Sequence, residues 1–453
     1  MSELYILFIV FAGVALLLFM VLKMKLSAFI GLLITSIFVG VLAGMPLSEI
    51  TASIQKGMGG TLGFVATVVG LGAIFGQMLE SSGGAGALAH HLVLKFGKDN
   101  SSWAMVITGF LVAIPVFLDV GLIILIPVVY ALTRDTKRSL LYYGIPLLAG
   151  LAVTHSFIPP TPGPIAVAEI MGADLGWIIL FGFIIGIPTA IIAGPLFGKF
   201  ISRKIYLQPP AVMFETKSTD QKSKAILPSF RLIIFLICIP LFLIVIGTFV
   251  NLGVDKEYFV PSLITEILVF IGHPFSALII ATLSAIYFLG IKTGLSKQKI
   301  MELSTKALGP AGIIILITGA GGVLKQILID SGIGNLMAES IAGSSMPLIL
   351  LAWILAASVR ITQGSATVAM ITAAGFMAPV LQVVPSNQPH IALMVIAIAS
   401  GATILSHVND SGFWLVSKYF GMNEKQTLQS WTVMETIISI CGLIFCLLFS
   451  LLL

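Results

Sequence analysis

The chain has 453 residues, of which 58% are hydrophobic and only 9% are charged, and its mean hydropathy is +1.10. Soluble domains carry about 25% charged residues, so this composition excludes a soluble protein and indicates an integral membrane protein. The formal net charge of +5 comes from lysines and arginines in loops between apolar runs, and it gives no reason to expect a nucleic-acid partner.

Apolar runs of about 20 residues, the length that crosses a bilayer core as a helix, recur along the chain. They are continuous and lack the alternating pattern of a membrane β-barrel, so helices are expected. We therefore predict an all-α polytopic membrane protein that is surrounded by membrane lipid. Its spans are expected at residues 4–22, 26–44, 61–80, 140–157, 176–198, 231–250 and 260–290, from 308, from 390, and at 431–453.

Positive charges predict the orientation in the cytoplasmic (inner) membrane, because lysines and arginines near span ends mark the cytoplasmic side. Lys23 and Lys25 follow the first span, which places the N-terminus outside. The same reasoning, continued along the chain, places the C-terminus outside and the hydrophilic linker 199–228 in the cytoplasm. The positive residues that fall off these loops are Lys56, Lys256, Lys325 and Arg360.

Two apolar blocks, 103–132 and 346–382, are predicted to enter and leave the membrane on the same face. The first block has positive residues on both sides, and the second has none on either side. Their first arms, 103–118 and 346–361, have 16 residues each, fewer than the about 20 needed to cross. Both blocks are typical of re-entrant helical hairpins, whose tips must be buried in protein or line a cavity.

The two halves of the chain resemble each other. "GQMLESSGGAGALA" (76–89) matches "KQILIDSGIGNLMA" (325–338) at an offset of 249, and "THSFIPPTPGP" (154–164) lies over "ILSHVNDSGFW" (404–414) at an offset of 250. Because the halves start on opposite sides, we predict two inverted-topology repeats, each with a re-entrant hairpin and a broken transmembrane helix. This architecture is typical of secondary transporters. The expected organisation is N-terminal scaffold helices in 1–60, a first repeat in 61–198, the linker 199–228, scaffold helices in 229–307 and a second repeat in 308–453.

Four polar breaks are expected to converge on one site. They are the hairpin tips 119–121 and 362–367 and the helix breaks 154–164 and 406–412, the first break holding four prolines that cannot continue a helix. Helix N-termini after such breaks favour an anion. The hydroxyl and amide side chains suit a ligand with many hydroxyl groups. The sequence therefore predicts a small polar site for an anionic solute.

Several candidate residues have two interpretations. Arg360 is either the partner of a substrate carboxylate or the partner of an internal acid, because an uncompensated buried arginine is costly. Asp119 and Asp410 either exchange protons or cap helix N-termini. His155 and His407 either titrate near physiological pH or act as neutral donors within the breaks.

At these residues the chain resembles the gluconate permease family, proton-coupled symporters of the ion transporter superfamily. The resemblance is carried by "IPVFLDVGLIILIPV" (114–128), "THSFIPPTPGP" (154–164), "RITQGSATVAMITAAG" (360–375) and "SHVNDSGFWLVSKYFGM" (406–422). It implies uptake of sugar acids such as gluconate and, in some members, of D-serine or related hexonates. From the wider superfamily it implies a homodimer with a central scaffold and an elevator-like moving domain.

The resemblance also implies which residues of the tips and breaks bind the substrate. To these we add Arg360, which precedes the second hairpin tip, His407 from the second break, and Thr161, where many family members have the His of PPHPGP. Asp119, His155, His407 and Asp410 are the candidates for proton coupling. The full expected set is Asp119, Gly121, Thr154, His155, Ser156, Thr161, Arg360, Thr362, Gln363, Gly364, Ser365, Thr367, His407, Asn409, Asp410 and Ser411.

Other classes of function are disfavoured. An intramembrane enzyme would need a nucleophile with a positioned base, and the adjacent Ser406 and His407 do not have that arrangement. A channel fits less well, because two opposed hairpins that hold one site suit alternating access. No metal site or cofactor is expected apart from the coupling ion. The resemblance favours a proton, but carboxylates and free carbonyls at broken helices would also suit sodium.

Overall fold

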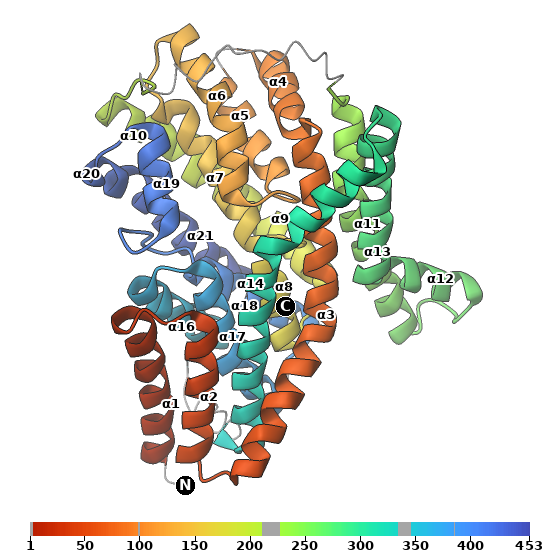
Figure 1. The fold of residues 1–453 in the computed structure, drawn as a ribbon, viewed down its shortest axis with the longest axis vertical. Helices are drawn as coiled ribbons and strands as arrows, with labels where there is room; N and C mark the ends of the chain where they lie inside the picture. Colours follow the sequence, from red (N-terminus) through yellow and green to blue (C-terminus); the bar gives the residue numbers. More distant parts are fainter. Residues whose placement is uncertain (1–2, 98–99, 211–226, 334–345, 385) are drawn as a thin grey trace.

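The computed structural model describes the chain except for residues 1–2, 98–99, 211–226, 334–345 and 385 (Figure 1). Within these described residues the regular elements are all helices. Eight of the helices are long and apolar enough to cross a membrane. The expected class of an all-α polytopic membrane protein is thereby confirmed.

The first half of the chain forms a helix pair, one long helix and a bundle that contains the first hairpin and the first break. A π-helical turn at Phe19–Lys23 extends the first helix, and another at Ile192–Leu196 (η2) joins the last two. The helices are α1 Glu3–Leu18, α2 Ala28–Leu42, α3 Leu47–Ser81, α4 Gly84–Phe96, α5 Ser101–Val112, α6 Leu118–Thr136, α7 Leu141–Phe157, α8 Pro162–Met171, α9 Leu175–Ile191 and α10 Phe197–Lys204.

The second half follows the same order. Helical turns at Ile286–Gly290 and Ile291–Thr293 extend its third helix, and a π-helical turn at Leu428–Thr432 (η6) precedes its last. The helices are α11 Phe230–Asp255, α12 Leu263–Gly272, α13 Pro274–Ala285, α14 Lys297–Asp330, α16 Leu348–Gln363, α17 Ala366–Val383, α18 Gln388–Gly401, α19 Ser411–Phe420, α20 Glu424–Thr427 and α21 Val433–Ser450.

The long helices α3 and α14 show how the two halves are related. They have 35 and 34 residues and begin 250 positions apart, at Leu47 and Lys297. They lie side by side and run in opposite directions (Figure 1). Near the start of α3, Lys56 Nζ lies 3.8 Å from Asp330 Oδ1 at the end of α14. Equivalent helices of the two halves are therefore antiparallel, as inverted repeats require.

Glycines allow these two helices to pack closely. A Cβ at Gly322 would lie 2.0 Å from Thr61 Oγ1 and 2.7 Å from the Gly57 carbonyl oxygen, so a side chain has no room there. Small residues at helix contacts let backbones approach, which strengthens van der Waals packing where lipid supplies no hydrophobic driving force. Beside this contact, Lys325 of α14 interacts electrostatically with Glu169 of α8. Lys325, one of the positive residues outside the predicted cytoplasmic loops, thus has an acidic neighbour.

Some expected boundaries differ from the structure. The divisions at 60/61 and 307/308 fall inside α3 and α14, because polar residues such as Lys56 lower the hydropathy of a helix end without ending the helix. The expected span 260–290 is two helices, since His273 caps α13 and Pro274 is its first residue. The linker 199–228 begins within α10, and its residues 211–226 lie outside the described residues, as do 334–338 of the second repeat motif.

Both predicted hairpins and both predicted breaks appear as interruptions between helices. Residues 113–117 separate α5 from α6, and Gly364 and Ser365 separate α16 from α17. Residues 158–161 separate α7 from α8, and 402–410 separate α18 from α19. The first tip is thus displaced from its expected position at 119–121, which forms the first turn of α6. Pro115 explains the shift, because it lacks the N–H that a continuing helix needs.

Candidate functional site

A cavity of about 510 Å³ lies where the second hairpin tip and the second break meet α6, α7 and α21. Both halves of the chain line it, so the four polar interruptions converge partly as expected. The expected substrate-binding residues that line it are Asp119, His155, Ser156, Arg360, Gln363, Gly364, Ser365, Thr367, Asn409, Asp410 and Ser411.

Other expected binding residues do not line this cavity. Gly121 packs in α6 against α7, and Thr154 is buried within α7. Thr362 Oγ1 donates back to the Ser358 carbonyl at 2.9 Å, in the last turns of α16. His407 lies in the second break with a buried Nδ1. These residues therefore do not face the cavity in this structure.

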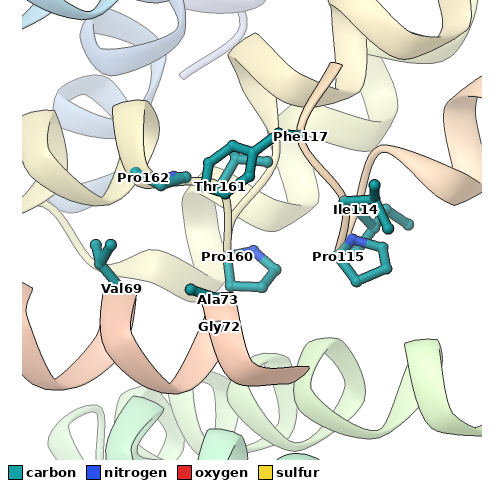
Figure 2. Close-up of a pocket in the computed structure, with 10 residues that line it drawn as sticks. Val69, Gly72, Ala73, Ile114, Pro115, Phe117, Pro160, Thr161 and Pro162 are labelled. Carbon is teal, nitrogen blue, oxygen red and sulfur yellow. The ribbon is translucent and has the colours of Figure 1, made fainter. Parts of the chain in front are cut away.

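Thr161 also lies away from the large cavity. It borders a gap of about 10 Å³ beside α3, together with Pro115, Phe117 and Pro160 (Figure 2). A space of this size holds about one water molecule. The Thr161 hydroxyl donates to the Ile158 carbonyl at 2.6 Å within the break. Phe117 lines both this gap and the large cavity, whereas Thr161 lines only the gap.

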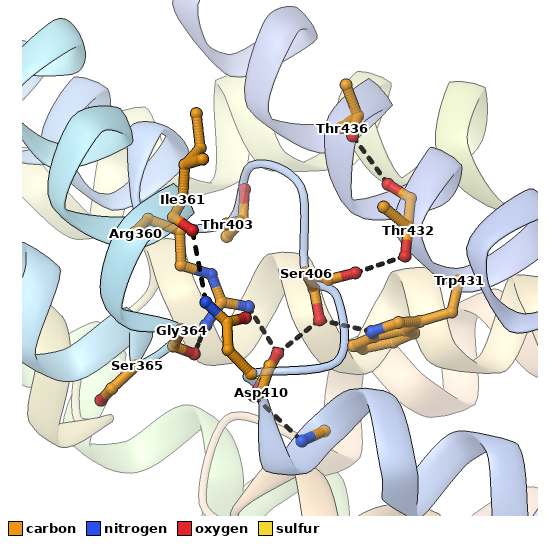
Figure 3. Close-up of polar contacts among 12 residues, drawn as sticks. Arg360, Ile361, Gly364, Ser365, Thr403, Ser406, Asp410, Trp431, Thr432 and Thr436 are labelled. Atoms are coloured by element: carbon orange, nitrogen blue, oxygen red, sulfur yellow. Dashed lines mark hydrogen bonds and ion pairs between the residues drawn. The ribbon is translucent and has the colours of Figure 1, made fainter. Parts of the chain in front are cut away.

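Arg360 forms a buried ion pair at the end of α16. Its side chain is 4% exposed, and its Nη2 lies 2.5 Å from Asp410 Oδ2. Its Nη1 donates to the Gly364 carbonyl (Figure 3). A cation is also favourable at a helix C-terminus. Of the two interpretations of Arg360, the pairing with an internal acid is confirmed, while its Nε remains without a partner among the described residues.

Asp410 caps the helix that follows the second break. Its Oδ1 accepts from the Gly412 N–H at 3.0 Å, as an N-cap residue does. Its Oδ2 accepts from Arg360 and from Ser406 Oγ. The capping interpretation of Asp410 is confirmed. Asp119 differs, because it lies inside the first turn of α6, where Phe117 occupies the N-cap position.

Ser406 connects the second break to the last transmembrane segment (Figure 3). Its Oγ accepts from Trp431 Nε1 at 2.6 Å while it donates to Asp410, and its carbonyl accepts from Thr432 Oγ1. A break with this many side-chain partners is fixed in position despite its lack of helical hydrogen bonds.

The second hairpin tip and the second break touch directly. Gly364 has φ +84°, and a Cβ there would lie 2.4 Å from the Asn409 carbonyl oxygen. Asn409 Nδ2 in turn donates to the carbonyls of Ile361 and Thr362, at 3.2 and 3.3 Å. These carbonyls belong to the last turn of α16, which has no helical donors. Gly364 thus allows the left-handed turn at the hairpin tip and also the close approach of Asn409.

Sequence reasoning missed two residues of the last transmembrane segment, Trp431 and Glu435, which both line the cavity. They are four positions apart and therefore lie on one helix face. The available signal was Glu435 itself, since an acid in an apolar transmembrane segment marks a functional site by default.

Four buried polar atoms that have no hydrogen-bond partner among the described residues belong to side chains that line the cavity. They are His155 Nδ1, Arg360 Nε, Gln363 Oε1 and Glu435 Oε1. Buried polar groups in proteins are almost always hydrogen-bonded, because leaving one unpaired costs about 1–3 kcal/mol. The arrangement is therefore suited to a polar ligand that offers several donors and acceptors.

The charges around the cavity are unbalanced. Asp119, Asp410 and Glu435 are carboxyl groups, whereas Arg360 is the one guanidinium and His155 the one imidazole on the described lining. An anion that entered alone would add to an excess of negative charge in a site partly removed from water. A cation that accompanies the anion offsets this repulsion.

Comparisons with known proteins agree with this architecture. The family model described as GntP family permease matches residues 5–452. The low-affinity gluconate transporter of Escherichia coli K12 is 44% identical over 434 residues, which cover 95% of each chain. The gluconate permease of Pseudomonas aeruginosa is 42% identical, covering 95% of this chain and 94% of its own. The Gnt-II system L-idonate transporter of Escherichia coli K12 is 40% identical, covering 97% of each chain.

Among solved structures, the YdaH transporter of Alcanivorax borkumensis has a similar fold, with a TM-score of 0.62 over 88% of each chain at 13% sequence identity. The resemblance seen in the sequence motifs is thus confirmed over nearly the whole chain. The relatives are named as permeases and transporters, in agreement with a transporter and not an enzyme. This chain is a multi-pass membrane transporter and belongs to the GntP permease family.

Proposed function

We propose that the chain is a secondary active transporter that imports gluconate or a closely related sugar acid across the cytoplasmic membrane, together with protons. The observation that carries the proposal is the cavity whose buried polar atoms lack partners in the protein. Relatives at 40–44% identity are named for gluconate or L-idonate, which are anions with many hydroxyl groups.

The cavity has the features that a sugar acid requires. Its volume of about 510 Å³ falls within the usual range of small-molecule sites, roughly 300–1,000 Å³. The first turns of α6, α17 and α19 contribute Asp119, Thr367 and Ser411 to its wall. Free N–H groups and positive dipole ends at helix N-termini favour a carboxylate. The unpartnered atoms of Gln363 and His155 would then pair with its hydroxyl groups.

The excess of carboxyl groups supports coupling to a cation. Of the proton-coupling candidates, Asp119, His155 and Asp410 line the cavity and His407 does not. A proton that binds to a titratable side chain at the cavity reduces the negative charge that an anionic substrate meets. Sodium held by carboxylates and break carbonyls is the alternative, and D-serine is the alternative substrate.

The transport cycle follows from the inverted repeats. The two halves have the same topology in opposite orientations across the membrane. They can therefore exchange conformations, and the cavity then opens to each side in turn. We propose that this exchange is of the elevator type, in a homodimer whose N- and C-termini both lie outside.

Uptake of labelled gluconate into proteoliposomes tests the proposal. We expect an inward proton gradient to drive accumulation, and unlabelled gluconate or idonate to block it. A matched experiment replaces the proton gradient by an inward sodium gradient at equal pH on both sides. Accumulation driven by sodium alone would overturn the coupling assignment. No accumulation of labelled gluconate under either gradient, with accumulation of labelled D-serine, would overturn the substrate assignment.

A further inference from the structure

Glu435 is a buried acid that none of the interactions described so far uses. The residue is 4% exposed, lies in α21 one turn after Trp431, and lines the large cavity. Its Oε1 is buried without a hydrogen-bond partner in the described part of the chain. A carboxylate held in this way is costly unless it is neutralised.

Resting on the proposed function, we propose that Glu435 is the residue that binds and releases the coupling proton. Its position suits the role, because it faces the same space as the substrate and interacts electrostatically with Arg360 and Asp410. A proton on Glu435 therefore changes the field at the substrate site directly.

The other carboxyl groups of the cavity are less suited to this role. Asp410 accepts from Arg360, from Ser406 and from the Gly412 N–H, so both of its carboxyl oxygens already have partners. Asp119 is exposed, so it does not carry the cost of a buried carboxyl group without a partner. Glu435 alone among the three combines burial with a free carboxyl oxygen.

The elements packed against α21 limit which charges Glu435 meets. The segments η2, η6 and α9 contain no titratable residue. The hairpin helix α16 contributes Arg360, and α7 contributes His155, with Tyr142 and Tyr143 at its opposite end. On α18 the titratable group is His390, in its first turn. The Arg360–Asp410 pair, His155 and Asp119 are thus the charged or titratable groups that share the cavity with Glu435.

With the cavity open to the outside, the Glu435 carboxylate takes a proton from a hydronium ion. The O–H bond of hydronium breaks as the O–H bond of Glu435 forms, which leaves water and removes one negative charge from the site. The sugar acid then binds as an anion beside the neutral acid. After the cavity opens to the cytoplasm, the substrate leaves, the O–H bond breaks and the proton returns to water. Substrate and proton therefore cross together.

The test is Glu435→Gln in proteoliposomes, because glutamine keeps the shape of the neutral acid and cannot release a proton. We expect gradient-driven gluconate accumulation to fall to the level seen without a gradient. Exchange of labelled for unlabelled gluconate should persist at a reduced rate and lose its dependence on pH. The exposed Glu424→Gln, which makes the same chemical change in α20, should accumulate gluconate as the unaltered protein does.

A second measurement is independent of transport. Purified protein in a weakly buffered detergent solution should take up protons when gluconate is added, and Glu435→Gln should not. Glu435→Asp, which keeps an acid, should restore proton uptake and coupled accumulation with a displaced pH profile, which a purely structural role of Glu435 would not produce.

The outcomes separate the two proposals. If the unaltered protein does not respond to a proton gradient, the proposed coupling fails and the role of Glu435 fails with it. If a proton gradient drives gluconate accumulation equally in the unaltered protein and in Glu435→Gln, proton symport stands and the proposed role of Glu435 is overturned. Loss of coupling in Asp119→Asn, with coupling retained in Glu435→Gln, would move the proton to Asp119.

Discussion

At the scale of single residues, the site is organised by one buried arginine. Arg360 holds Asp410 and the Gly364 carbonyl, and thereby joins the hairpin tip to the helix break. Removing one partner of a buried ion pair leaves an uncompensated charge, which is worse than removing both. The ion pair therefore accounts for the shape of the site as well as for its charge.

We predict that Arg360→Ala destabilises the protein by about 3–5 kcal/mol and abolishes gluconate uptake, because Asp410 is left buried without its cation. The thermal unfolding midpoint in detergent measures the stability change. The double variant Arg360→Ala with Asp410→Asn should recover part of the lost stability, since asparagine still caps α19, but not the uptake. Equal stability of the single and double variants would contradict the account of the ion pair.

Residue roles were predictable where the local sequence determines them. The N-cap role of Asp410 follows from its place before a helical run, because capping depends on neighbours in the chain. The role of Trp431 and Glu435 depends on how α21 packs against a break 25 residues earlier in the chain, which local patterns do not contain. The position of Thr161 in its motif predicted contact with the substrate, but in the structure Thr161 lines the small gap beside α3 and not the large cavity.

At the scale of elements, the contact between the second hairpin and the second break defines the cavity. Gly364 and Asn409 meet so closely that the tip cannot carry a side chain. Hydropathy predicted four interruptions between helices, because polar interruptions in apolar runs are visible in the sequence. The hydropathy pattern predicted the first tip a few residues after its observed position, and it predicted domain boundaries inside the single helices α3 and α14. The reason is that helix ends depend on capping and packing, which hydropathy does not measure.

The Gly364 contact gives a matched pair of variants. Gly364→Ala should destabilise the protein and abolish uptake, because alanine is strained at φ +84° and its Cβ would overlap the Asn409 carbonyl. Gly44→Ala meets similar strain at φ +77° with nothing within 4 Å. We expect Gly44→Ala to cost about 1 kcal/mol and Gly364→Ala about 1–3 kcal/mol more, measured by thermal unfolding. Equal effects of the two substitutions would show that the contact is unimportant.

At the scale of the whole molecule, the antiparallel pair α3 and α14 relates the two halves. The inverted repeat was predictable because matching motifs recur at a nearly constant offset in chain segments that start on opposite sides. The full extent of the repeat was not predictable from the sequence. The helices α1 and α2 also have counterparts, α11 and α13, which begin 227 and 246 positions later, but no shared sequence motif marks these pairs.

The inverted arrangement predicts where equivalent helix ends lie. Ser48 and Gln298 are exposed and occupy the first turns of α3 and α14. In a background without native cysteines, Ser48→Cys should react with a membrane-impermeant maleimide added outside, and Gln298→Cys only with reagent added inside. Labelling of both positions from one face would refute the inverted topology.

The central claim is that the large cavity holds the substrate, and thiol protection tests it most directly. Thr367 lines the cavity and Thr362, five residues earlier, does not. In the background without Cys238, Cys441 and Cys446, gluconate should slow maleimide labelling of Thr367→Cys and leave that of Thr362→Cys unchanged. Equal labelling rates of Thr367→Cys with and without saturating gluconate would place the substrate elsewhere.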